Sequence, residues 1–320
     1  MIHDPVKKTV TTESGEVAVL SSPRVSIGLP VFNGERFIAE TIESVLSQTY
    51  QDWDLVICDN ASTDGTREIC EAYLEKDSRI RYYRNEANLG GPRNYNRCFE
   101  LARGEYLKWI AADDTIAPEY IELCVQALDA NPDAVVAYSR AHSIDGDSRK
   151  LNECRWTVPI EEQSDPVMRF RRFRLRSAWG AFPLLYVFGV LRTEMLRSTR
   201  LHGIYINSDS CLVVEMLLRG CFVEVPADLM AFRHHPGSYS SYADSNAKRL
   251  QFFDPEGGLL SRLLGHKRLH LEYLRAILMA PLSLRQKLRL MAYNLVWALG
   301  RAGRDEAPEA ESSLLPATTL

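Results

Sequence analysis

Strand-like and helix-like segments alternate through the first half of the chain, and this alternation is the strongest constraint on the fold. Short apolar segments with β-branched residues recur at intervals of roughly 25 to 30 residues, and segments with helical spacing of apolar side chains separate them. The predicted strands are 24–31, 53–58, 79–83, 105–111 and 134–138. Parallel strands need crossover connections of this length, so we expect an α/β fold with a mostly parallel central sheet flanked by helices.

The second half of the chain lacks this alternation. Residues 140–165 are polar and predict irregular structure with a hairpin turn at Asp145-Gly146-Asp147. The later segments predict a strand over 184–191, a helix from Asn207 to Arg219 that Gly220 ends, two short strands within 222–233, and helices from 246 to about 301. We therefore expect a helical C-terminal extension after the α/β domain.

Composition narrows the class of protein. The chain of 320 residues is 46% hydrophobic and 25% charged, which excludes a wholly disordered protein, and its net charge of -4 gives no sign of nucleic-acid binding. Seven cysteines are scattered without a C-x-x-C pair, which predicts reduced thiols in a cytoplasmic protein. The longest apolar run, within 178–191, is too short to span a membrane, so any contact with lipid would be peripheral.

Two adjacent carboxylates follow the strand predicted over 105–111. Asp113 and Asp114 repel each other and lose hydration if they lie in a cleft, so the pair is costly unless a cation or hydrogen-bond donors satisfy it. Ligands bind at the carboxyl ends of the strands in open α/β sheets. The residues alone leave two interpretations: a divalent-metal and phosphate site, or a loop whose carboxylates favour the start of the next helix.

Four linked motifs resemble those of family 2 glycosyltransferases. They are Leu29–Glu35 with Ser44, Ser47 and Gln48 after it, Cys58–Thr66, Asn88–Gly90 with Ala102–Tyr106, and the Asp113-Asp114 pair. The resemblance extends from Val25 to about Gly220 in the family's order. It implies a GT-A fold, the nucleotide-diphospho-sugar transferase fold, with a nucleoside-diphosphate sugar as donor, Mn²⁺ or Mg²⁺ as the metal, and inverting transfer of the sugar to an acceptor hydroxyl.

The resemblance also implies roles in the donor site. Asp114 would ligate the metal ion and Asp113 would bind the donor ribose or sugar, although Ala111 stands where an acidic residue is common in the family. Asp59 would accept an N–H group of the base. Pro30 would shape the turn after the first strand, and Phe32 would pack on the base. Glu35 would contact the nucleotide, and Arg93 would lie near the phosphates. Ordinary structural roles also fit: an Asx-turn for Asp59, core packing for Phe32, a helix start for Glu35 and a solvated side chain for Arg93.

Two candidates lie in the second half. Asp209 resembles the acidic residue that opens the acceptor-side helix and would be the general base that deprotonates the acceptor hydroxyl. Ser208 stands where the family often has Glu, and the helix dipole also favours a first-turn Asp. His235 matches a histidine that completes the metal or diphosphate site in some relatives, although a loop histidine is often structural. Residues 238–242 could form a lid over the donor.

Two other segments allow more than one interpretation. The basic segment Arg169–Arg176 would attract an anionic acceptor or a membrane surface, or it is one face of a helix whose Phe170 and Phe173 pack inward. The apolar stripes of 271–299 carry Arg and Lys residues between them. Core packing, a homodimer or peripheral membrane contact explains these stripes equally well.

We therefore expect an inverting, metal-dependent glycosyltransferase that acts on a sugar, lipid-linked or small-molecule acceptor in polysaccharide, lipopolysaccharide or glycoconjugate biosynthesis. The expected division is a disordered tail over 1–23, a GT-A domain over 24–240, a helical extension over 241–302 and a disordered tail over 303–320. Within the domain, 24–139 would bind the nucleotide and 140–240 the acceptor.

Three competing hypotheses were weighed. A non-catalytic nucleotide-sugar-binding protein is the main rival, because Ala111 and Ser208 depart from acidic positions of the family. A phosphatase of the haloacid dehalogenase type would need a nucleophilic Asp where Ser62 stands. A dinucleotide-binding Rossmann enzyme needs G-x-G-x-x-G after its first strand, and 29–34 lacks that pattern.

Overall fold

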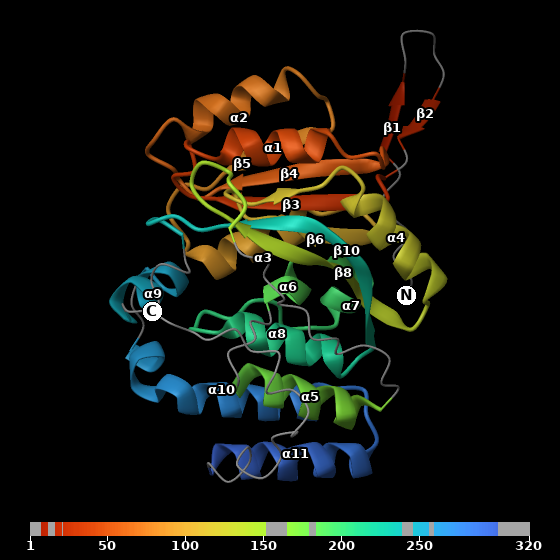
Figure 1. Ribbon diagram of the computed structural model, residues 1–320, viewed down its shortest axis with the longest axis vertical. Coiled ribbons are helices and arrows are strands. Elements are labelled where there is room, and N and C mark those ends of the chain that lie inside the picture. Colours follow the sequence, from red (N-terminus) through yellow and green to blue (C-terminus); the bar gives the residue numbers. More distant parts are fainter. Residues whose placement is uncertain are drawn as a thin grey trace.

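The protein is built around one eight-stranded sheet with helices on both faces (Figure 1). The computed structural model describes residues 8–11, 17–20, 22–151, 165–178, 184–238, 246–255 and 259–299. Strand order is β5-β4-β3-β6-β9-β8-β10-β7. The strands are β3 (Val25–Val31), β4 (Trp53–Asp59), β5 (Ile80–Arg84), β6 (Tyr106–Trp109), β7 (Thr115–Ile116), β8 (Ala134–Ile144), β9 (Val190–Arg192) and β10 (Cys221–Arg233).

The first half forms the predicted parallel sheet. β3 pairs in parallel with β4 and with β6, and β4 pairs in parallel with β5. The connecting helices are α1 (Ile38–Leu46), α2 (Thr66–Leu74) and α3 (Gly91–Leu101), and Figure 1 shows α1 and α2 on one face and α3 on the other. Every residue of β3 and β4 is buried, as expected for strands covered on both faces. The carboxyl ends of β3, β4 and β6 therefore meet at one edge.

Helix α3 lies close against the sheet because β3 carries a glycine beneath it. A Cβ atom on Gly28 would lie 2.7 Å from the Cβ of Cys98 on α3 and 3.1 Å from the Trp109 ring on β6. The close contact fixes the height of α3 over β3, and with it the loop at the start of α3. This loop belongs to the edge where the candidate site residues lie.

The second half departs from the predictions in three places. The strand predicted over 184–191 is instead the short helix α6 (Leu184–Val187) followed by β9, which lies antiparallel between β6 and β8. The turn before β9 needs Gly189, because a Cβ there would lie 2.6 Å from the Ala137 carbonyl oxygen. The two strands predicted within 222–233 are one strand, β10, whose register against β8 shifts between Val225 and Asp228, next to Pro226.

The predicted C-terminal helical region consists of three separate helices in the described ranges. It contains α9 (Asn246–Phe253), α10 (Leu259–Met279) and α11 (Leu284–Ala298). Pro281 follows α10, and Ser283 with Gln286 forms a capping box that starts α11. Within the segment predicted as a disordered tail, β1 (Lys8–Thr11) and β2 (Val17–Leu20) pair as a two-stranded sheet, in keeping with their β-branched residues. The predicted lid residues 239–242 and the tail 303–320 lie outside the described ranges.

The remaining helices are α4 (Tyr120–Ala130), α5 (Pro166–Ala178), α7 (Thr193–Arg197) and α8 (Ser208–Leu217). Helix α4 packs against β8 and β10. The helices below the sheet are arranged in layers. Figure 1 shows α8 nearest the sheet, then α5 and α10, and α11 outermost. Among the helices of the described ranges, none is both long and apolar enough to cross a bilayer.

Two arginines of the basic segment on α5 point into the protein. Phe170 and Phe173 are buried, as the helix interpretation predicted, but Arg169 and Arg174 are buried as well. Arg169 Nε donates to the Leu217 carbonyl oxygen at 2.7 Å. The Arg174 guanidinium lies 4.8 Å from the Tyr273 ring centroid. These two arginines therefore join α5 to its neighbouring helices and do not form a surface patch.

Candidate functional site

The loop after β6 holds the two adjacent carboxylates in different environments. The Asp114 side chain is buried, and its Oδ1 accepts a hydrogen bond from the backbone N–H of Arg233 at 3.0 Å. Its carbonyl oxygen accepts a hydrogen bond from Thr41 Oγ1 at 2.8 Å. Burial and the nearby charge of Asp113 raise the pKa of Asp114 well above the ordinary range of an Asp. Asp114 is thus tied to the backbone, and Asp113 is the more accessible carboxylate.

Asp113 meets a histidine from the far end of the domain. Its Oδ2 lies 3.0 Å from Nε2 of His235, which follows β10. About a quarter of the Asp113 side chain is exposed. The Phe37 ring lies against the His235 imidazole, with 4.6 Å between ring centroids, and holds it in place. The structure therefore brings together two of the site residues that the sequence predicted.

Arg233 joins the segments around this pair. Its side chain is fully buried, and Nε donates to the Asp113 carbonyl oxygen at 2.8 Å. Its other nitrogens donate to the Asp145 carbonyl oxygen at 3.1 Å, to Ser148 Oγ at 2.8 Å and to Glu40 Oε2 at 2.7 Å. The sequence analysis missed Arg233 and Glu40. Arg233 could have been identified from the sequence as an arginine in an otherwise apolar strand, directly before the His234-His235 pair.

The donor set at the Asp113–His235 pair suits a divalent cation in part. A carboxylate oxygen and an imidazole nitrogen face each other, and both are ordinary ligands of Mn²⁺. Their direct contact would have to open to admit an ion. In the described ranges no group of three or more His, Cys, Asp or Glu side chains could hold a metal. The described residues would therefore supply two ligands, and phosphate or water oxygens could supply others.

Asp59 lies at the end of β4 and is fully buried. Tyr82 Oη donates to its Oδ2 at 2.6 Å, the Ser62 backbone N–H donates to its Oδ1 at 2.8 Å, and Arg84 forms an ion pair with it. Burial alone would raise the pKa of Asp59, but these hydrogen bonds outweigh it and lower the pKa. A base would reach this carboxylate only by displacing Arg84 or Tyr82, so its predicted contact with the base stays a prediction.

The other predicted donor residues lie around the same edge. Phe32 is 48% exposed just after β3, which leaves its ring open to a ligand and removes the core-packing interpretation. Glu35 Oε2 accepts a hydrogen bond from the Gly65 backbone N–H at 2.8 Å, and so links the loops after β3 and β4. Arg93 Nη1 donates to the Leu89 carbonyl oxygen at 3.3 Å at the start of α3. Pro30 is buried in β3 opposite Cys58.

Asp209 lies in the first turn of α8, as predicted. Its Oδ1 is buried and has no hydrogen-bond partner among the described residues, and burial raises the pKa of its carboxyl group. Burial and the charges of Asp113, Asp114 and Asp209 together raise the pKa of Tyr95. The three carboxylates therefore share an electrostatic influence on one tyrosine.

Two aromatic residues at this place were missed by the sequence analysis. Tyr95 on α3 and the buried His202 have ring centroids 5.2 Å apart, and His202 lies equally close to the ring of Trp109. Burial lowers the pKa of His202 to about 4, so its imidazole is neutral at pH 7, and its Nε2 has no hydrogen-bond partner in the described part of the chain. The only sequence signal was their position beside the predicted loop after Asn88 and before the Asp209 helix.

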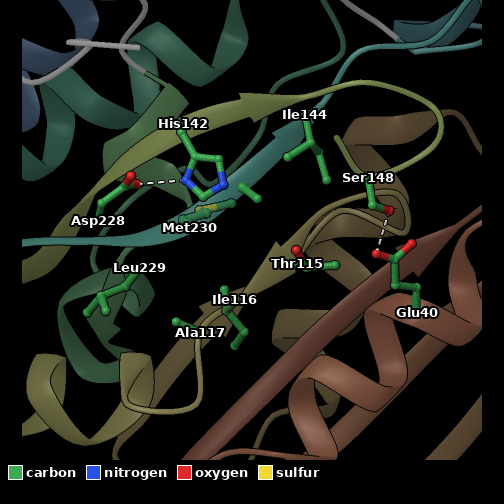
Figure 2. Close-up of a pocket in the computed structure, with 11 residues that line it drawn as sticks. Glu40, Thr115, Ile116, Ala117, His142, Ile144, Ser148, Asp228, Leu229 and Met230 are labelled. Atoms are coloured by element: carbon green, nitrogen blue, oxygen red, sulfur yellow. Dashed lines mark hydrogen bonds and ion pairs between the residues drawn. The ribbon is translucent and has the colours of Figure 1, made fainter. Parts of the chain in front are cut away.

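A pocket of about 260 Å³ is lined by residues of β7, β8 and β10 together with Glu40 and Ser148 (Figure 2). Glu40 connects this pocket to Arg233, because its Oε1 accepts a hydrogen bond from Ser148 Oγ at 2.7 Å and its Oε2 accepts one from Arg233. Across the pocket, His142 Nδ1 lies 2.8 Å from Asp228 Oδ1 (Figure 2). None of the sequence-predicted site residues lines this pocket.

Curated relatives match limited parts of the chain. Putative glycosyltransferase EpsE of Bacillus subtilis (strain 168) is 40% identical over 110 residues, which cover 34% of this chain and 40% of EpsE. Chondroitin synthase of Escherichia coli is 29% identical over 157 residues, which cover 49% of this chain and 23% of the synthase. The matched part of the chain spans less than half the length of each of these relatives.

Solved structures share the fold, and a family model covers about half of the chain. S. aureus TarS 1-349 in complex with UDP-GlcNAc has a TM-score of 0.63 at 18% identity, covering 85% of this chain and 71% of that one. Mannosyltransferase PcManGT from Pyrobaculum calidifontis, with GDP-Man and Mn²⁺, has a TM-score of 0.52 at 18% identity, covering 88% and 81%. The likeness confirms the GT-A fold. The model described as Glycosyl transferase family 2 matches residues 26–191, and the chain belongs to that family.

Proposed function

We propose that this protein is an inverting glycosyltransferase that moves a sugar from a nucleoside-diphosphate sugar to an acceptor hydroxyl in polysaccharide, lipopolysaccharide or glycoconjugate biosynthesis. The observation that carries the proposal is the contact between Asp113 and His235 at the carboxyl edge of β3, β4 and β6. Family membership supports it, as do relatives named as a putative glycosyltransferase and as chondroitin synthase.

The donor would bind across the loops that follow β3, β4 and β6. The exposed Phe32 ring would pack on the base, and the Glu35 contact to Gly65 holds two of these loops in register. A divalent cation at this edge would neutralise the charge that develops on the departing diphosphate. Asp113 and His235 would hold that cation, so in this proposal Asp113 takes the ligand role that the family resemblance implied for Asp114. Arg233 keeps the backbone of Asp113 in place.

Asp209 would accept the proton of the acceptor hydroxyl. Its Oδ1 has no hydrogen-bond partner among the described residues, and the pKa of its carboxyl group is raised by burial, which makes the carboxylate a better proton acceptor. The charges of Asp113, Asp114 and Asp209 all raise the pKa of Tyr95, which supports a single site for donor and acceptor. We also propose a cytoplasmic location, because Cys58, Cys70, Cys98, Cys124 and Cys211 are free thiols.

The first test is calorimetric binding of UDP, GDP and dTDP, each with and without Mn²⁺. We expect one nucleotide to bind in a Mn²⁺-dependent manner, and Asp113→Asn to abolish that dependence. Asp52→Asn, which changes an exposed carboxylate between β3 and β4, is the matched control. Absence of nucleotide binding by folded protein would overturn the proposal. Binding without even slow hydrolysis of the corresponding nucleotide sugar would favour a non-catalytic binder.

A further inference from the structure

Exposed apolar side chains are concentrated at one end of the molecule. Ten large apolar residues of the described ranges are exposed, and eight of them belong to α10 and α11 or directly follow α11. The eight are Leu271, Leu278, Met279, Leu284, Leu288, Leu295, Val296 and Leu299. A surface helix normally buries its apolar side chains and exposes polar ones, so this arrangement indicates a contact surface.

The apolar residues of α11 form one outward stripe. Leu284, Leu288, Leu295 and Leu299 fall within an arc of about 60° on a helix with 3.6 residues per turn. Leu284 is 71% exposed and Leu299 is 61% exposed. The opposite face carries the buried Leu290 and packs toward α5 and α10. Figure 1 shows α11 as the outermost layer of the stack, so its outer face points away from the described part of the protein.

The charge around this stripe differs in sign from that of the whole chain. Five Lys and Arg residues and one acidic residue lie between Arg268 and Leu299, whereas the chain has a net charge of -4. The acidic residue is Glu272, which is buried and paired with Arg200 at 2.6 Å. Arg285 and Arg289 are exposed along the border of the stripe. The outer surface is thus apolar and cationic.

A surface that is both apolar and cationic fits one kind of partner best. A second copy of the stripe would offer no carboxylate to Arg285 and Arg289, because α11 contains no acidic residue, so charge does not favour a two-fold dimer through this face. An anionic lipid surface instead offers apolar tails to the leucines and phosphates to the arginines. We propose that the outer face of α11 docks the protein on anionic membranes. The helix would lie in the plane of the interface, and the sheet would stand above it.

The test is co-sedimentation of the full chain with phosphatidylcholine vesicles that contain or lack phosphatidylglycerol. We expect binding to the anionic vesicles that weakens at high salt. Arg285→Gln with Arg289→Gln should lower the vesicle affinity roughly 30-fold, since each basic residue near an anionic surface contributes about 1 kcal/mol. Leu288→Gln with Leu295→Gln should lower it roughly tenfold or more through lost apolar contact.

Leu151→Gln is the matched control, because Leu151 is 45% exposed and lies outside α10 and α11. It should bind vesicles like the wild type, and circular dichroism should show that all variants are folded. No binding of the wild type to anionic vesicles would overturn the proposal. So would binding that Leu288→Gln with Leu295→Gln leaves unchanged, or a concentration-dependent dimer in sedimentation velocity that those two substitutions dissociate while vesicle binding is absent.

Discussion

Nε2 of His235 lies 3.0 Å from Oδ2 of Asp113, although 122 residues separate the two in sequence. The contact joins the ends of two strands that are not neighbours in the sheet, because Asp113 follows β6 and His235 follows β10. It depends on Arg233, whose backbone N–H binds the Asp114 carboxylate and whose side chain binds the Asp113 carbonyl oxygen. One residue therefore sets the distance between the two halves of the proposed cation site.

His235→Ala should weaken Mn²⁺-dependent nucleotide binding. The substitution removes one of the two protein ligands proposed for the cation, and even supporting residues of metal sites change affinity roughly 10- to 100-fold. Isothermal titration of nucleotide at several Mn²⁺ concentrations measures the effect. His234→Ala is the control, because His234 Nε2 lies 2.8 Å from Ser143 Oγ and points to a different neighbour. Equal losses in both variants would contradict the assignment.

Asp209→Asn should lower kcat on the order of 10²- to 10⁴-fold while nucleotide binding is retained, because an amide cannot accept the acceptor proton. The pH dependence follows from the raised pKa of Asp209. The base must be ionised, so transfer should decline as pH falls through that raised value, at a higher pH than for an ordinary Asp. Initial rates across pH measure both effects, with Glu194→Gln as an exposed control. Unchanged kcat in Asp209→Asn would exclude the general-base role.

Arg233→Lys should destabilise the fold although it keeps the charge. A lysine ammonium cannot reach the four acceptors that the guanidinium contacts, and the loss of several buried hydrogen bonds costs roughly 2 to 3 kcal/mol. Urea unfolding measures the difference. Arg140→Lys is the matched control, because that exposed arginine pairs only with Glu224 in the ion pairs of the described ranges and should cost less than about 1 kcal/mol. Equal costs would show that Arg233 does not act as a clamp.

Lys108 should give the stability a distinct pH dependence. Burial lowers the pKa of its ammonium group from 10.5 to about 7, although its Nζ donates to the Trp109 carbonyl oxygen at 3.1 Å. Between these two pH values the unfolded chain binds more protons at this site than the folded protein, so the free energy of unfolding should rise with pH across that window. The test compares thermal unfolding of the wild type with Lys108→Met, in which the rise should be smaller. Parallel pH profiles would mean that Lys108 keeps its charge when buried.

Local sequence patterns predicted the first half of the fold well. Strand-forming residues in 25–31 and 53–59 and the helical spacing between them depend on neighbours within a few positions, and a parallel sheet requires such units. The insertion of β9 between β6 and β8 was not predictable in the same way. The short segment 184–192 reads equally well as one strand, and its pairing depends on residues more than 50 positions away.

The sequence by itself determined the α/β alternation, the family motifs and the chemical types at the candidate site, because these reside in single residues and short spacings. Only the tertiary structure decided that Asp113 faces His235 while Asp114 is buried against Arg233, and that Asp59 is enclosed by Tyr82 and Arg84. It also decided that the leucines of α11 face outward. Such choices depend on which distant strands and helices meet, and a local pattern carries no information about that register.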